Sequence, residues 1–527
     1  MPAPSASARP RFTGRRAGVT VPLFSLHSTR SWGTGELLDV PRLSRWLQAA
    51  GLRMLFLLPI NETALDDPSP YAAISSMAID PGAISMWAVE DLTAQGGERA
   101  LDQPSRAALR ECRAAPSVDQ CAVRRLKREA LLLAFDRFVA HHWVRDTPRA
   151  ARLRAFLERE AWWLDDHARF SALRDRHGAR PWWEWREPDC RAEGLSPAPG
   201  DRGVLFHQYQ QWLAAEQWAR ARAASPRLQV FGDFPFMVRR DSADVWARRD
   251  QFLDQATVGA PPDAFSASGQ DWGLPAMRWE AMAGDGYRWL RERGRRGAEL
   301  FDGFRIDHLV GYYRTYILPV GGQEPYFSPP DEESQRERGV RILSLLAGLG
   351  VEVVAEDLGT IPPFVRESLR SLGLPGYRVL RWERRWDEPG QPFIDPADYP
   401  PVSLAASGTH DTESLAGWWE GLSAEERRLV LAIPFFDGSE PARAGHDDAE
   451  IRDGLLECLM SSGSKLVVVP FQDLFGWRER VNVPATISRD NWSYRLPWSV
   501  EELCTLPEPR KRAAELRRWA REYGRWP

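Results

Sequence analysis

Three short acidic motifs, each at the end of an apolar run, constrain this chain of 527 residues most strongly. They are Phe-Arg-Ile-Asp-His at 304–308, Val-Val-Ala-Glu-Asp-Leu-Gly at 353–359 and Ser-Gly-Thr-His-Asp at 407–411. A carboxylate placed where a buried strand ends is costly unless it is paired or used in function. The motifs follow one another about 50 residues apart, as strand–helix units of a (β/α)₈ barrel do. Because such barrels place their active sites at the carboxyl ends of the strands, the motifs predict an acidic active site.

The rest of the chain repeats the same pattern of β-forming residues, a polar or glycine-containing loop and an amphipathic helix. Eight strands are predicted, at 18–26, 54–60, 229–236, 301–307, 351–357, 376–382, 402–409 and 465–472. Eight such units favour one closed parallel barrel over an open sheet. The predicted fold class is therefore α/β, a (β/α)₈ TIM barrel with a large helical insertion and a lid loop over its C-terminal face.

The largest interruption of the barrel pattern lies between the second and third predicted strands. We expect residues 78–226 to form a helical, Trp-rich insertion, since structureless loops of that length are uncommon. Helical periodicity is found at 124–144, 148–175 and 208–224.

A second interruption, residues 239–300, is predicted to be a lid or substrate-loop insertion. Its stretch 261–273 is rich in Pro, Gly and Ser, which is typical of a long ordered loop over the barrel mouth. Residues 1–17 are expected to be a flexible tail, and 18–527 the catalytic barrel that carries both insertions.

Composition excludes several classes of function. A net charge of −4 and a pI near 6.2 give no basis for a nucleic-acid or anionic membrane partner. No uninterrupted apolar run is long enough to span a membrane. The five cysteines are scattered without a CxxC pair, and the N-terminal stretch lacks the apolar core of a signal peptide. We therefore expect reduced thiols and a cytoplasmic location.

No metal or cofactor is expected. The sequence has no HExxH, no Walker A motif and no Gly-x-Gly-x-x-Gly that opens a helix after a strand. Lysine occurs only at Lys127, Lys465 and Lys511, which disfavours Schiff-base chemistry. The 24 tryptophans favour a carbohydrate ligand, although we expect most of them to be structural.

The first two motifs contain the pair of carboxylates that cleavage of a glycosidic bond requires. Arg305 lies two residues before Asp307 and would share its face of a strand, so it could hold Asp307 ionised as a nucleophile. The alternative is a structural ion pair inside the barrel. Glu356 and Asp357 face opposite ways in a regular strand, and the longer Glu356 is the better candidate for the proton donor. For Asp357 we expect a helix N-cap role.

The third motif ends in His410 and Asp411. A carboxylate near a sugar ring can bind hydroxyl groups more strongly as the transition state forms. Taken alone, a His-Asp dipeptide is more typical of a surface or capping pair. The case for Asp411 rests on the order of the three motifs along the barrel.

These residues resemble glycoside hydrolase family 77, the 4-α-glucanotransferases, over about residues 18–497. The resemblance rests on segments 232–236, 241–246, 261–273, 304–308, 355–359, 408–411 and 472–474, with 181–185 and 206–218 in the helical insertion. It implies that Asp307 is the nucleophile, Glu356 the general acid/base and Asp411 the transition-state stabiliser. The substrate-binding residues that it implies are Arg305, His308, His410, Asp233, Tyr71, Gln270 and Trp272.

The function implied is transfer of α-1,4-glucan segments from a donor glucan to the 4-hydroxyl of glucose or a maltooligosaccharide, by retaining double displacement. One alternative is an α-1,4-glucan hydrolase, similar to an α-amylase, on the same barrel. The other is a non-catalytic α-glucan-binding protein, which would be expected to have lost one of the three carboxylates.

Overall fold

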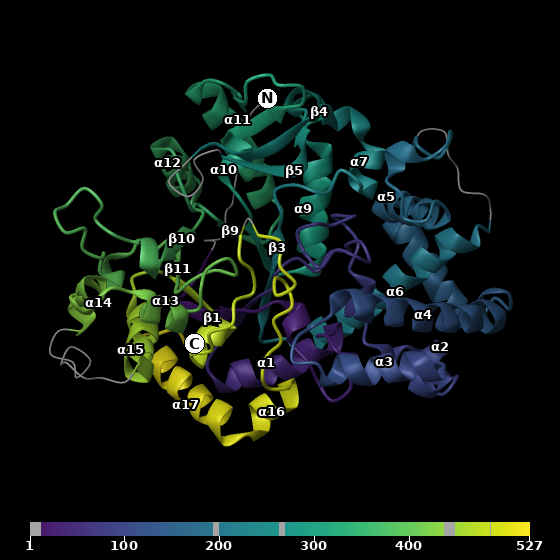
Figure 1. The fold of residues 1–527 in the computed structure, drawn as a ribbon, viewed down its shortest axis with the longest axis horizontal. Coiled ribbons are helices and arrows are strands. Elements are labelled where there is room, and N and C mark those ends of the chain that lie inside the picture. The colour runs from purple at the N-terminus through teal and green to yellow at the C-terminus, as the bar shows by residue number, and fades with distance from the viewer. Residues whose placement is uncertain (1–11, 193–199, 263–268, 437–447, 485, 527) are drawn as a thin grey trace.

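Eight parallel strands close into a barrel at the centre of the protein (Figure 1). The computed structural model describes residues 12–192, 200–262, 269–436, 448–484 and 486–526. Around the barrel the strands follow the order β1-β12-β11-β10-β9-β6-β3-β2, and all neighbouring pairs are parallel. The predicted fold class is confirmed.

Each predicted strand overlaps one strand of the barrel. The strands are β1 Arg16–Thr20, β2 Met54–Phe56, β3 Gln229–Phe234, β6 Gly303–Ile306, β9 Glu352–Ala355, β10 Gly376–Val379, β11 Ser403–Ala406 and β12 Leu466–Pro470. They read as nearly continuous apolar runs because a barrel strand is covered on both faces. Strand β1 already includes Arg16 and Ala17, which were expected in the tail, and residues 1–11 lie outside the described part.

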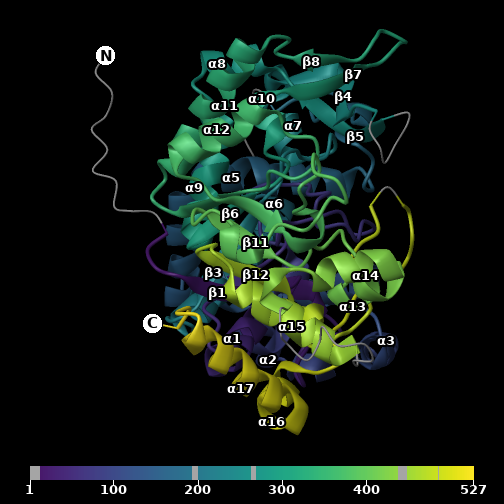
Figure 2. The same cartoon turned by 90° about the vertical axis from the view of Figure 1, so that its left-hand side faces the viewer.

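Helices surround the barrel on its outer side (Figures 1 and 2). Those that follow barrel strands are α1 Val40–Ala49, α7 Ala243–Ala247, α8 Trp279–Gly284, α9 Arg288–Leu300, α10 Val310–Tyr313, α11 Glu332–Ala347, α12 Pro363–Leu372, α13 Leu415–Gly421, α14 Ala424–Leu431, α15 Asp448–Ser461, α16 Val500–Thr505 and α17 Pro507–Glu522. No helix in the described ranges is long and apolar enough to cross a membrane.

Between β2 and β3 the chain forms a group of helices beside the barrel, on the right in Figure 1. They are α2 Glu90–Thr93, α3 Gln103–Ala114, α4 Gln120–Phe138, α5 Pro148–Arg176 and α6 Arg202–Ala223. The three periodic segments of the sequence overlap α4, α5 and α6. Helix α5 starts with Pro148, whose fixed φ suits the first helical turn. Helix α6 is capped by Asp201, whose side chain accepts two backbone N–H groups.

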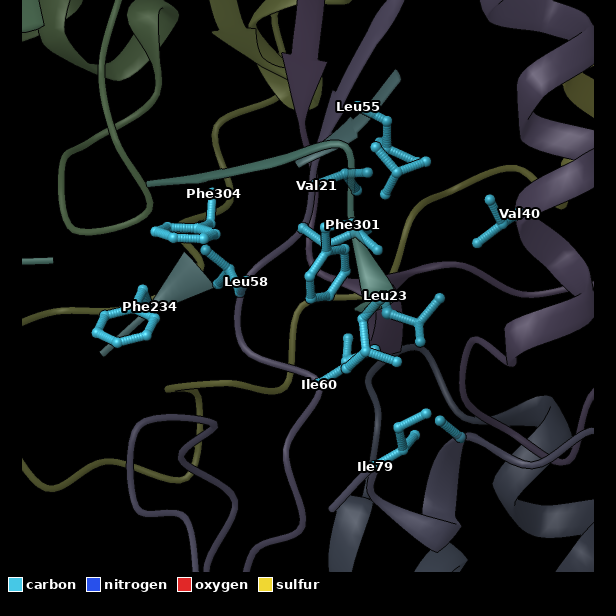
Figure 3. Close-up of a cluster of buried hydrophobic side chains, with 14 of the residues drawn as sticks. Val21, Leu23, Val40, Leu55, Leu58, Ile60, Ile79, Phe234, Phe301 and Phe304 are labelled. Carbon is cyan, nitrogen blue, oxygen red and sulfur yellow. The ribbon is translucent and has the colours of Figure 1, made fainter. Parts of the chain in front are cut away.

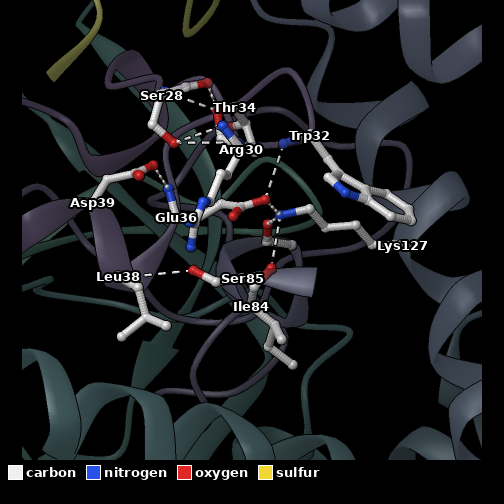
Figure 4. A network of polar contacts seen from close by, with 12 residues as sticks. Ser28, Arg30, Trp32, Thr34, Glu36, Leu38, Asp39, Ile84, Ser85 and Lys127 are labelled. Atoms are coloured by element: carbon white, nitrogen blue, oxygen red, sulfur yellow. Dashed lines mark hydrogen bonds and ion pairs between the residues drawn. The ribbon is translucent and has the colours of Figure 1, made fainter. Parts of the chain in front are cut away.

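A buried lysine fastens these helices to the first barrel loop (Figure 4). Lys127 of α4 is 1% exposed and donates to Glu36 Oε1 at 2.7 Å and to the carbonyl oxygens of Gly82 and Ile84. Glu36 also accepts the backbone N–H of Trp32 at 3.0 Å. Three hydrogen bonds satisfy the ammonium group, which makes burial of the charge tolerable.

A second sheet lies where the sequence predicted a loop. Strands β4 Phe252–Ala260 and β5 Gln270–Met277 pair antiparallel, and β7 Thr315–Pro319 and β8 Tyr326–Ser328 extend the sheet in the order β5-β4-β7-β8. Residues 270–273 were expected in a loop but belong to β5, while 263–268 lie outside the described residues. The prediction missed β5 because Gly273 and Pro275 resemble turn residues.

The largest apolar cluster joins the barrel wall to α1 (Figure 3). Val21 and Leu23 follow β1, and Val40 of α1 lies in the same cluster. Phe234 and Phe304, on neighbouring strands β3 and β6, stack with ring centroids 5.2 Å apart. These contacts set the positions of the strand ends on which the acidic motifs lie.

The segment after α17 packs against the turn that precedes β12. Arg525 is fully buried and donates to the carbonyl oxygens of Met460 (2.6 Å), Ser462 (3.0 Å), Ser464 (3.0 Å) and Lys465 (3.2 Å). One guanidinium therefore satisfies four backbone acceptors in the turn that leads into β12.

We predict that Arg525→Ala lowers the free energy of unfolding by about 2–4 kcal/mol, because it leaves several buried carbonyl groups unsatisfied. Urea unfolding followed by circular dichroism measures the change. Arg510→Ala is the control, since Arg510 is exposed on α17, and we expect a change within about 0.5 kcal/mol. Equal effects of the two substitutions would contradict the role of Arg525.

Candidate active site

Arg305 lies at the centre of the site, at the carboxyl end of β6. Its Nη2 is 2.9 Å from Asp307 Oδ1 and 2.9 Å from Glu356 Oε2, and its Nη1 is 2.6 Å from Asp233 Oδ2. The expected pairing of Arg305 with Asp307 is present. Three barrel strands, β3, β6 and β9, thus bring three carboxylates to one guanidinium that is itself 7% exposed.

The two carboxylates of the first and second motifs are close together. Because Asp307 Oδ1 and Glu356 Oε2 both lie 2.9 Å from the same nitrogen, they are at most twice that distance, about 5.8 Å, apart, which is shorter than the separation of about 6.5–9.5 Å in inverting glycosidases. This spacing suits attack by one carboxylate on the sugar, with no room for a water between them.

Glu356 is held by backbone as well as by Arg305. It accepts the N–H of His308 at 2.8 Å, and His308 has a φ of +42°. That left-handed conformation is unfavourable for a residue with a Cβ, so the backbone is strained at the residue that binds Glu356. Burial lowers the pKa of the His308 imidazole to about 4, so the ring is neutral at pH 7.

The carboxyl groups of Asp307 and Glu356 titrate as a pair because they share Arg305. Burial raises the pKa of Asp307 well above its usual range; Arg305 opposes this, and the charges of Glu356 and Asp233 add to it. Burial also acts to raise the pKa of Glu356, but Arg305 and the N–H of His308 outweigh it and hold this pKa below its usual value. The surroundings therefore shift the pKa values of the two carboxyl groups in opposite directions, upward for Asp307 and downward for Glu356.

Tyr71 contacts both Asp233, on β3, and His410, in the motif at 407–411. Its hydroxyl donates to Asp233 Oδ2 at 2.6 Å, and its ring stacks on His410 with centroids 5.2 Å apart. Trp492 contacts both rings, at 5.7 Å from Tyr71 and 5.9 Å from His410. Asp233 Oδ1 is buried and has no hydrogen-bond partner among the described residues.

Strand β5 brings the expected lid residues over the site. The ring of Trp272 meets His308 edge to face, with centroids 4.7 Å apart, and its Nε1–H donates to Gln270 Oε1 at 3.3 Å. The contact places an indole beside the histidine whose backbone binds Glu356.

Asp411 is the most open of the three catalytic candidates, with its side chain 43% exposed. Its Oδ2 lies 3.4 Å from His410 Nε2, and its Oδ1 accepts from Asn482 Nδ2 at 2.7 Å. Arg480 donates to the Asp411 carbonyl oxygen at 2.8 Å. The ten residues predicted from the sequence therefore lie in one continuous chain of contacts.

Asn482 and Arg480 were not predicted, since they lie in the long segment between β12 and α16 and do not follow an apolar run directly. The Asn before Val483-Pro484 is a weak signal, because an isolated amide in a loop is common.

The expected N-cap role of Asp357 is wrong. Its Oδ1 accepts the N–H of Tyr377 at 2.7 Å, and Arg378 lies 3.5 Å from its Oδ2, so it binds the neighbouring strand β10. Helix α12 is preceded instead by Pro362. Gly376 permits the contact, since a Cβ there would lie 2.6 Å from Asp357 Oδ1. Asp357 thus fixes β9 against β10, on which the direction of Glu356 depends.

Among the described residues, no group of three or more His, Cys, Asp or Glu side chains could hold a metal ion. The side chains that the structure brings together here are carboxylates, arginines, histidines, amides and aromatic rings. A closed (β/α)₈ barrel with this arrangement at its C-terminal end defines a carboxylate-dependent enzyme of the retaining glycoside hydrolase type.

Comparison with known proteins identifies the family. The family model described as 4-alpha-glucanotransferase, glycoside hydrolase family 77, matches residues 21–501, and this chain belongs to that family. The 4-alpha-glucanotransferase of Chlamydia pneumoniae is 33% identical over 508 residues, which cover 93% of each chain. That of Thermus thermophilus is 32% identical over 474 residues, covering 86% of this chain and 89% of its own. The transferase interpretation is thereby favoured over the hydrolase.

Solved structures agree on the fold. The amylomaltase from Streptococcus agalactiae in complex with acarbose matches with a TM-score of 0.79 at 24% identity, over 97% of this chain and 100% of its own. The amylomaltase from Corynebacterium glutamicum matches with a TM-score of 0.77 at 24% identity, over 97% of this chain and 75% of its own.

We predict that Asn482→Ala lowers kcat/KM by about 10- to 100-fold, because Asp411 loses a hydrogen bond that holds its carboxylate in place. Rates with maltotriose, compared between variant and wild type, measure the effect. Asn482→Asp is the second variant, and it should lose more, since it places a like charge 2.7 Å from the Asp411 oxygen. Wild-type kcat/KM in both variants would show that Asn482 does not position Asp411 for catalysis.

Proposed function

We propose that this protein transfers segments of α-1,4-glucan to the 4-hydroxyl of glucose or a maltooligosaccharide, with Asp307 as nucleophile, Glu356 as general acid/base and Asp411 as transition-state stabiliser. The observation that carries the assignment is the single guanidinium of Arg305, whose contacts limit the distance between Asp307 Oδ1 and Glu356 Oε2 to at most about 5.8 Å, shorter than in an inverting pair. Asp411 contacts His410, whose ring stacks on Tyr71 of the same site, and its side chain is 43% exposed.

The reaction has two displacements at the same anomeric carbon. Glu356 gives its proton to the bridging oxygen while Asp307 attacks, and the reducing-end fragment leaves. A covalent glucosyl ester on Asp307 remains. Glu356, now ionised, takes the proton from the acceptor 4-hydroxyl, and that oxygen displaces Asp307 with a second inversion. The product has the same α configuration as the donor.

The proton must lie on Glu356 when the donor is bound. In the free protein the pKa of Asp307 is raised and the pKa of Glu356 is lowered, so the shifts act against this arrangement. Both forms of the pair have the same total charge, so a glycosidic oxygen that accepts a hydrogen bond from Glu356 would favour the productive form. Arg305 contacts both carboxylates and stabilises whichever is ionised.

The remaining predicted residues are proposed to hold the sugar at the cleavage point. Asp233 Oδ1 is a buried acceptor that finds no partner among the residues the structure describes, and a sugar hydroxyl or a water could satisfy it. His308 is neutral and can serve as a hydrogen-bond donor, while Tyr71 and His410 form a stacked aromatic wall. Gln270 and Trp272, on β5, would cover the glucan from the opposite side.

The ester on Asp307 can react with an acceptor hydroxyl, which gives transfer, or with water, which gives hydrolysis. Limited access of water therefore favours transfer. We propose that the region 239–300 acts as the lid that limits this access, with the Trp272 indole packed against His308. The helical region 78–226 is proposed as its fixed support. A cytoplasmic location is proposed as well, and it agrees with five cysteines that are all free thiols.

We predict that the protein, incubated with maltotriose alone, forms glucose together with maltopentaose and longer chains. Chromatography of the products by chain length over time measures this. Glucose and maltose with nothing longer than the substrate would show hydrolysis and contradict the proposal. Asp307→Asn is the matched variant: it should abolish both outcomes while it keeps glucan binding, because the amide has the same shape but cannot attack. Turnover at the wild-type rate in this variant would exclude Asp307 as the nucleophile.

A further inference from the structure

Few of the tryptophans are open to solvent. In the described part of the chain, the tryptophans with large exposed surfaces are Trp386 (54%), Trp183 (43%) and Trp382 (41%). Two of these three lie four residues apart, in the segment between β10 and β11. Exposed indoles cost solvation free energy unless something covers them, so this pairing calls for a functional explanation.

The segment that carries them is ordered. Arg384 and Phe393 pair across it in an antiparallel bridge, and the Arg385 N–H donates to the Pro392 carbonyl oxygen at 2.9 Å. The Arg384 guanidinium lies over the Phe393 ring at 4.6 Å and over the Trp386 ring at 5.5 Å. One face of the Trp386 indole is therefore supported by Arg384, which leaves its exposed surface as a fixed platform.

The base of the segment is joined to the third catalytic motif. Arg381 Nε donates to the Ser407 carbonyl oxygen at 3.2 Å, and its Nη1 donates to Glu413 Oε2 at 3.2 Å. Trp418, on α13, contacts Phe393 at 6.4 Å and lies 5.4 Å from the Arg381 guanidinium. In Figure 1 the chain between β10 and β11 extends outward beyond the helices on that side of the barrel. The segment between β10 and β11 thus begins at the active-site end of the barrel and extends away from it.

We propose that Trp382 and Trp386 form a surface site for α-1,4-glucan chains, separate from the catalytic site. The flat apolar faces of indole rings match the faces of glucose units, and the exposed Arg385, Asp387 and Gln391 supply hydrogen-bonding groups around them. The inference rests on the proposed function for the identity of the ligand.

A glucan held at this site would raise the local concentration of chain ends at the catalytic centre. Such tethering adds affinity for long chains, which can reach both sites, and adds nothing for short ones. The site would therefore determine a preference for donor length and would leave the chemistry of transfer unchanged.

We predict that Trp386→Ala, placed in the Asp307→Asn background, raises the Kd for soluble linear amylose about three- to tenfold, as loss of one aromatic contact requires. Isothermal titration with amylose measures this. In the active enzyme, the same substitution should raise KM for amylose and leave the rate with maltotriose unchanged. Trp382→Ala should act in the same direction, and Trp386→Phe, which keeps an aromatic face, should restore most of the amylose affinity.

The outcomes separate this inference from the proposed function. If the wild-type enzyme makes no longer chains from maltotriose, the proposed function fails, while amylose binding can still be measured. Unchanged amylose affinity in Trp386→Ala and in Trp382→Ala overturns the surface site. Equal losses with amylose and maltotriose would overturn it too, because the segment would then support the catalytic centre. A change in oligomeric mass with unchanged amylose affinity would assign the two indoles to a protein interface instead.

Discussion

Arg305 makes the active site possible, because it allows three carboxylates to share one small volume. Asp307 and Glu356 approach the same nitrogen at 2.9 Å, and Asp233 approaches the other at 2.6 Å. Without the guanidinium, two ionised carboxylates at most about 5.8 Å apart would repel each other by at least about 3 kcal/mol at an effective dielectric constant of about 20. The barrel supplies the rigid strand ends that keep this geometry, and the chemistry depends on it.

Most of the barrel and of the site could be predicted from the sequence, because a strand covered on both faces leaves a continuous apolar run and ends in a functional side chain. The motifs at 304–308, 353–359 and 407–411 show this. The sheet containing β4 and β5 could not be predicted. Its strands contain glycine and proline, and their antiparallel pairing leaves no pattern in the local sequence. Asn482 and Asp357 were missed or misassigned for the same reason: their partners lie 71 and 20 residues away in the chain.

The regions added to the barrel support the site from a distance. Tyr71 lies in the segment after β2, and Ser76 in that segment donates to Asp244 Oδ1 of α7 at 2.6 Å. Trp289 of α9 donates to the same oxygen at 2.8 Å. On the other side, Lys127 joins the added helices to Glu36 in the loop after β1. Buried charged and polar contacts of this kind fix the position of a loop more strictly than apolar packing, because each must be satisfied in one geometry.

The central claim is that Asp307 forms a covalent bond to the sugar, and trapping that bond tests it most directly. An activated glucosyl fluoride, offered to the protein without any acceptor, should form the ester faster than water removes it. Mass spectrometry of the digested protein should then find one glucosyl unit on the peptide that contains Asp307. A glucosyl unit on a different carboxylate, or a product of inverted configuration with no adduct, would contradict the account.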